Sequence, residues 1–226
     1  MLINPFLIYL GFRIGRLQSV HGRHVAMLWL IALLLIPLVI LPGFENCSVL
    51  PKVPTTVWGG LLITLLLSVG GIVLSFPIGV LLALGRRSSL PVVKLFSIFF
   101  IEVVRGVPLV TILFMFSIIL ALFLPSESRI DRVIRALMGT VVFSAAYTAE
   151  NVRGGLQAIP PGQVEAAKAM GLKNFHITIL IVLPQALRLV IPTIVGQFIS
   201  LFKDTTLVYI EGINDLLGIG NAVLNL

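Results

Sequence analysis

Few side chains in this chain of 226 residues are placed to carry out a reaction. The three histidines are scattered, Cys47 is the only cysteine, and there is no G-x-x-x-x-G-K-S/T phosphate loop. A disulfide within the chain and a cysteine-based metal site are therefore excluded, and ATP hydrolysis by this chain is not expected. We expect neither an enzyme nor a resident metal or cofactor.

Two pairs of opposite charges are the first candidates for a specific role. Glu102 and Arg105 lie three residues apart, and so do Glu150 and Arg153, which places each pair on one face of a helix. A charge inside a membrane-spanning segment is a functional candidate by default. Near the end of such a segment, however, a charged side chain needs no further partner if it pairs with an opposite charge or extends to the membrane–water interface. We predict two structural ion pairs.

A short polar segment is the second candidate. Asp204, Thr205 and Thr206 follow an apolar stretch, and their oxygen atoms suit the ammonium group of a small substrate. Tyr147 is a further candidate for the same path. Because Asp and Thr also favour helix caps, a purely structural role stays open for this segment.

The elements that position these residues are membrane helices. The chain is 58% hydrophobic and only 11% charged, whereas a soluble domain carries about 25% charged residues. A spanning helix needs about 20 mostly apolar residues, and five stretches come near this length. We therefore predict an all-α, polytopic transmembrane helix bundle with about five spans, at 24–41, 57–84, 95–124, 134–147 and 175–202.

The distribution of basic residues orients these spans. The net charge of +7 marks cytoplasmic loops, in which Lys and Arg accumulate, and does not indicate a nucleic acid partner. The N-terminus is predicted to be cytoplasmic, with residues 1–56 forming a tail, a retained first membrane helix and an external linker before a membrane domain at 57–226. Arg129, Arg132 and Arg135 oppose this orientation, because they fall in a segment predicted to be outside. The residues that support it are Arg13, Arg16, Arg23, Arg86, Arg87, Lys94, Arg153, Lys168 and Lys173.

The cytoplasmic loop at 154–176 contains a short helix of its own. Pro160 and Pro161 precede a run of helix formers at 163–170, and Gly171 is typical of a residue that ends a helix. A helix this short is marginal in water by itself. Either it docks on a partner, or it is an ordinary turn between two helices.

The same loop resembles a known family. Glu165-Ala166-Ala167, then Gly171 and Ile181-x-Leu183-Pro184 fill every fixed position of the E-A-A-x3-G-x9-I-x-L-P signature of ABC importer permeases. The segment 102–108, with Arg105-Gly106-x-Pro108, resembles the polar and general amino acid branch of that family. The resemblance covers roughly residue 57 to the end of the sequence.

The resemblance implies a function and a set of partners. In the family, the loop forms a coupling helix that sits in a cytoplasmic ATPase, so that Glu165, Ala166, Ala167, Lys168 and Gly171 would contact or position this partner. A second permease subunit, identical or homologous, an external substrate-binding protein and the lipid bilayer complete the expected assembly.

The resemblance therefore implies that the chain is a multi-pass subunit of a bacterial inner membrane importer. The importer would transport an amino acid, and the partner ATPase would hydrolyse ATP. Family members usually have one more helix, so the final helix is expected to be missing here. An ion-gradient-driven secondary transporter and a non-transporting membrane assembly subunit remain alternatives. The sequence does not identify the amino acid.

Overall fold

The computed structural model describes residues 55–123 and 130–224, and every regular element in these two ranges is helical. The N-terminal tail and first membrane helix expected at 1–56 lie almost entirely outside the described residues, so that domain boundary stays a prediction. The helical membrane bundle itself is observed. Two described segments, Gly60–Arg86 and Asn174–Glu211, are long and apolar enough to cross a bilayer.

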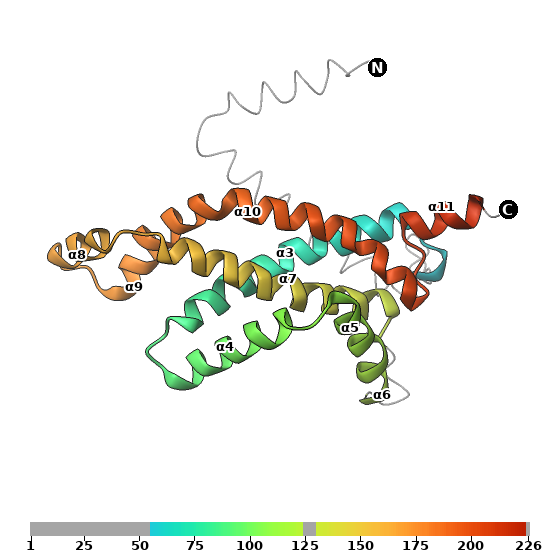
Figure 1. Cartoon of the computed structure of the whole chain (residues 1–226), viewed down its shortest axis with the longest axis horizontal. Coiled ribbons are helices and arrows are strands. Elements are labelled where there is room, and N and C mark those ends of the chain that lie inside the picture. The colour runs from blue at the N-terminus through green and yellow to red at the C-terminus, as the bar shows by residue number, and fades with distance from the viewer. Residues whose placement is uncertain (1–54, 124–129, 225–226) are drawn as a thin grey trace, which may run out of the picture. The chain divides into compact units, whose positions relative to one another are not determined.

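Three long helices form the centre of the bundle (Figure 1). They are α3 (Gly60–Arg86), α7 (Arg132–Gln157) and α10 (Leu183–Asp204), and α7 packs against both of the others. The first turn of α7 is capped by Asp131, whose carboxylate accepts a hydrogen bond of 2.8 Å from the Val133 amide. A short 3-10 turn (Thr55–Val57) precedes α3, and the Thr55 hydroxyl donates to the same carboxylate.

Small residues let these helices approach closely. A Cβ atom on Gly79 of α3 would lie 2.7 Å from Cβ of Thr148, and one on Gly155 of α7 would lie 2.6 Å from the carbonyl oxygen of Ala186 in α10. Close backbone approach is the usual means by which membrane helices associate, since lipid provides little hydrophobic driving force between them. These two glycines therefore set the spacing of α3, α7 and α10.

The third predicted span is not one straight helix, and the prediction is wrong on this point. The segment is divided into α4 (Pro91–Arg105) and α5 (Leu109–Phe114), which continues through a π-helical turn (Met115–Ile119) into α6 (Leu120–Phe123). The chain bends by 109° between α4 and α5. Pro108 lacks an amide hydrogen and forces the residue before it out of the helical region, so the helix ends and restarts there.

The number of five spans is not confirmed. The described residues contain two candidate spans, or three if α4 and α5 together count as one. The fourth predicted span falls within α7, which has 26 residues and carries charges towards both of its ends. The first predicted span lies outside the described residues.

The two ends of the bundle differ. At one end, α8 (Pro161–Ala169) and α9 (Asn174–His176) connect α7 to a π-helical segment (Ile177–Val182) that leads into α10 (Figure 1). The turn after α3 is at this end, since Arg87 donates to the carbonyl of Leu156 over 3.4 Å. At the other end, α10 runs into a 3-10 segment (Thr205–Glu211), and α11 (Leu216–Leu224) packs on the start of α3.

This arrangement bears on the predicted orientation of the chain in the membrane, which Arg132 and Arg135 opposed. Both lie at the start of α7, at the end of the bundle opposite α8. The guanidinium of Arg135 donates to the carbonyl of Ser117 in the π-helical turn after α5. Arg135, one of the three charges that opposed the predicted orientation, is therefore bound to the protein itself.

Candidate functional site

The loop with the E-A-A pattern forms a helix that projects from one end of the bundle (Figure 1). α8 starts at Pro161, which occupies a first-turn position where a missing amide hydrogen has no cost. Its last turn ends in a Schellman motif, because the amide of Gly171 donates to the carbonyl of Lys168 (2.9 Å) and the amide of Leu172 donates to Ala167 (3.2 Å). Gly171 has φ of +78°, a conformation that glycine adopts without strain.

The exposed surface of α8 differs in one position from the surface expected from the sequence. Ala167 is only 3% exposed and belongs to the same buried cluster as Ile177 and Val182, so it attaches the helix to the bundle and does not face outwards. Glu165, Ala166 and Lys168 are exposed. Met170, which the sequence pattern did not indicate, is 81% exposed.

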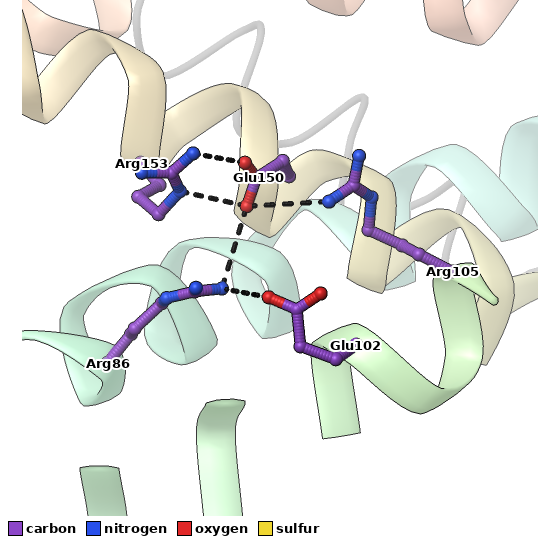
Figure 2. Close-up of polar contacts among 5 residues, drawn as sticks. All are labelled: Arg86, Glu102, Arg105, Glu150 and Arg153. Atoms are coloured by element: carbon purple, nitrogen blue, oxygen red, sulfur yellow. Dashed lines mark hydrogen bonds and ion pairs between the residues drawn. The ribbon is translucent and has the colours of Figure 1, made fainter. Parts of the chain in front are cut away.

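A network of five charges joins α3, α4 and α7 (Figure 2). Glu150 is its centre: Arg153 contacts both carboxylate oxygens, Arg105 lies at 3.6 Å and Arg86 at 3.7 Å. Arg86 also bonds Glu102 at 2.9 Å. Three guanidinium groups therefore share two carboxylates, which leaves an excess of one positive charge.

The partners within this network differ from those expected. Glu150 and Arg153 contact each other, but Glu102 pairs with Arg86 of α3, and Arg105 approaches Glu150 of α7. The reason is the packing of α4 between its neighbours, which brings a guanidinium group of α3 to Glu102 and a carboxylate of α7 to Arg105. Arg105, the last residue of α4, also lies over the ring of Tyr147 at 5.5 Å, within reach of a cation–π interaction.

A second polar network joins α7 to α10 and α3 and was not predicted from the sequence. The amide nitrogen of Gln197 donates to the carbonyl of Ser144 (3.0 Å) and the hydroxyl of Thr148 (3.0 Å). Asn151 donates to the amide oxygen of Gln197 (2.6 Å), and Ser75 of α3 donates to the hydroxyl of Ser144 (2.9 Å). The only sequence signal was the polar residues at four-residue spacing in α7, which by itself does not indicate a partner on α10.

The residues predicted for a substrate path lie on α7, at the end of α10 and in the 3-10 segment after it. Tyr147 is half-buried on α7, and Asp204 is the last residue of α10. Thr205 is buried and donates its hydroxyl to Phe202 (2.8 Å), while Thr206 donates to Lys203 (3.0 Å). Both threonine hydroxyls are therefore already bonded to the backbone of the preceding turn.

These features define a membrane protein that is helical throughout residues 55–123 and 130–224, with a short exposed helix at one end and polar networks between its long helices. Residues 75–223 match the family of binding-protein-dependent transport system inner membrane components. The chain belongs to this family, and the resemblance predicted from its E-A-A loop is confirmed.

Several proteins with described roles are similar to the chain. It is 49% identical over 196 residues to YhdY, an inner membrane amino-acid ABC transporter permease protein of Escherichia coli strain K12, covering 87% of this chain and 53% of that protein. It is 50% identical over 175 residues to BztC, the glutamate/glutamine/aspartate/asparagine transport system permease protein of Rhodobacter capsulatus, covering 77% and 40%. The chain thus spans about half the length of these two relatives.

A shorter relative and a solved structure align over most of their lengths. The glutamate/aspartate import permease protein GltK of Escherichia coli O6:H1 is 37% identical over 177 residues, with 76% of this chain and 79% of that protein covered. The crystal structure of an amino acid ABC transporter with histidines superposes with a TM-score of 0.66 at 30% identity, covering 74% of this chain and 77% of the other.

Proposed function

We propose that this chain is a membrane-spanning permease subunit of an ATP-driven amino acid importer. The observation that carries the proposal is α8: a helix of nine residues, held to the bundle by Ala167 and ended by the left-handed Gly171, which otherwise presents its side chains to the outside. Such a helix suits insertion into a separate subunit. Rigid-body movement of that subunit then shifts the bundle, a recognised mode of switching.

The proposed assembly contains a cytoplasmic ABC ATPase on α8, a second permease subunit and an external substrate-binding protein. The chain is multi-pass in the inner membrane with its N-terminus in the cytoplasm. Supporting this orientation, basic residues of the turn after α3 and of α8 gather at one end of the bundle, as expected for a cytoplasmic face. Glu165, Ala166, Lys168 and Met170 form the contact with the ATPase.

The proposed substrate is an acidic amino acid or its amide. The names of BztC and GltK describe transport of glutamate and aspartate, and that of BztC also glutamine and asparagine. Tyr147 and Asp204 are the proposed contacts along the path. Thr205 and Thr206 lie at the outer end of the proposed path, and their hydroxyls donate hydrogen bonds to backbone carbonyls.

The test is uptake into proteoliposomes that contain the complete transporter, with radiolabelled glutamate, aspartate, glutamine and asparagine. We expect uptake that requires ATP and persists without an ion gradient. Uptake that continues without ATP and stops when the proton gradient collapses would contradict the proposal.

A pair of variants tests the docking helix. Ala166→Trp places a large side chain on the exposed surface of α8, and Ser89→Trp does so in the turn after α3, at the same end of the bundle. We expect Ala166→Trp to lose co-purification of the ATPase and Ser89→Trp to retain it. Equal retention by both variants would show that α8 is not the docking site.

A further inference from the structure

One face of α7 is only partly covered by the other described helices. Tyr147, Glu150, Asn151 and Gly154, here called the α7 strip, follow the i, i+3, i+4, i+7 spacing of one helix face and are half-buried or exposed. Their neighbours Thr148, Ala149 and Val152 are fully buried. This partly covered face therefore carries a phenol, a carboxylate and an amide.

The α7 strip runs from membrane depth towards the end of the bundle that carries α8. Asn151 is bonded to Gln197, which is in the middle third of the apolar segment Asn174–Glu211. A charge or an amide facing lipid at this depth is costly, and such groups face the interior of a bundle or water. The strip is therefore covered by water, by a substrate or by another protein chain, and not by lipid.

α10 continues this polar face. Apart from the exposed Pro184, Arg188, Leu189, Pro192 and Lys203, it carries two stripes of different character. One stripe is apolar and suits lipid: Ile191, Val195, Ile199 and Phe202. The other stripe consists of small and polar residues at helical spacing: Thr193, Gly196, Gln197 and Ser200. The Gln197–Asn151 hydrogen bond joins this polar stripe to the α7 strip, and the stripe ends at Asp204.

On the opposite side of the α7 strip, Arg105 is the cation with the weakest pairing in the network (Figure 2). Arg153 and Arg86 each have a carboxylate oxygen within hydrogen-bond distance, at Glu150 and Glu102. Within the described ranges, the only ion pair of Arg105 is the 3.6 Å approach to Glu150. Its side chain is 34% exposed, and the network as a whole carries one excess positive charge.

We propose that the α7 strip and the polar stripe of α10 form the substrate path within this chain, and that Arg105 binds the α-carboxylate of the passing amino acid. A guanidinium group suits this role because it bonds a carboxylate through two parallel N–H donors. Asn151 donates to Gln197 and keeps its own carbonyl oxygen for the substrate's ammonium group. The inference rests on the proposed importer function and assigns to Arg105 a role beyond a structural ion pair.

Cysteine accessibility tests the path without relying on transport. In a Cys47→Ser background of the complete transporter, Gly196→Cys is compared with Ile199→Cys on the apolar stripe. A side chain at Gly196 meets no atom within 4 Å, so the substitution is accommodated. We expect a charged, water-soluble thiol reagent to modify Gly196→Cys but not Ile199→Cys, and L-glutamate or L-glutamine to slow the reaction.

Three outcomes would overturn the path. They are absence of modification at Gly196→Cys, modification that neither amino acid slows, and a disulfide between two permease chains at this position. The last would show that a second copy covers the face. None of these results affects ATP-dependent uptake by the parent protein, so failure of the path is distinguishable from failure of the importer function.

Kinetics then test Arg105 itself. Loss of a charge-assisted contact predicts that Arg105→Gln raises the KM for uptake about tenfold, with partial recovery in Arg105→Lys. The control is Arg87→Gln, since Arg87 is exposed in the turn after α3 and bonds only the Leu156 carbonyl among the described residues. An unchanged KM in correctly folded Arg105→Gln protein would leave Arg105 with a structural role only and refute the inference.

Discussion

Adjacent glycines in α7 provide a sharp test of how closely α7 and α10 pack. A methyl group on Gly155 would lie 2.6 Å from the carbonyl oxygen of Ala186 and 2.7 Å from a methyl carbon of Val190. A methyl group on Gly154 meets no atom within 4 Å. Gly155→Ala and Gly154→Ala are therefore a matched pair in one helix turn, with opposite surroundings.

The expected magnitude follows from two opposing terms. Replacing glycine by alanine inside a helix favours folding by about 1 kcal/mol, and this gain is the same for both positions. Overpacking costs about 1–3 kcal/mol, and applies to Gly155 alone. The contact with the Ala186 oxygen is shorter than a normal carbon–oxygen approach of about 3.3 Å. We therefore expect Gly155→Ala to be less stable than Gly154→Ala by about 1–3 kcal/mol.

The measurement is denaturant-induced unfolding of the two purified variants in the same detergent, followed by tryptophan fluorescence or circular dichroism. Val190→Ala combined with Gly155→Ala serves as a second comparison, because it removes the clash with a side chain but not the clash with the backbone oxygen. The combined variant should therefore stay less stable than Val190→Ala alone. Equal stability of the two glycine variants would refute the close approach of α7 and α10.

Three further predictions concern other parts of the bundle. Gly171→Ala should strain the end of α8 by about 1–2 kcal/mol, because φ is +78°, and reduce co-purification of the ATPase, while Gly162→Ala in open surroundings should not. Glu150→Gln should lower the free energy of unfolding by about 1–3 kcal/mol, since three arginines lose their shared partner. Glu102→Gln should lower the free energy of unfolding by less than about 1 kcal/mol, because Glu102 is 55% exposed. Similar losses of stability for Glu150→Gln and Glu102→Gln in denaturant titrations would contradict the central position of Glu150. Asp131→Ala should cost about 0.5–2 kcal/mol through loss of the α7 cap, and increase hydrogen exchange in the first turn of α7.

The sequence predicted a large part of the fold for local reasons. Apolar stretches of sufficient length indicated membrane helices, and the helix at 163–170 with its terminal glycine corresponds to α8 within a few residues. The position of Pro108 was noticed, but its consequence was not. Whether a proline kinks a helix or redirects the chain by 109° depends on the contacts of the segments on either side of it.

Local patterns also determined that Glu102, Arg105, Glu150 and Arg153 lie on shared helix faces, because helical spacing is a property of the chain itself. Only the tertiary structure decided their partners: Glu102 contacts a residue 16 positions away, and Arg105 approaches a residue of another helix. The same holds for Ala167, which packing turns inwards. Spacing along a helix fixes which side chains lie together, whereas the angle and distance between helices fix what they meet.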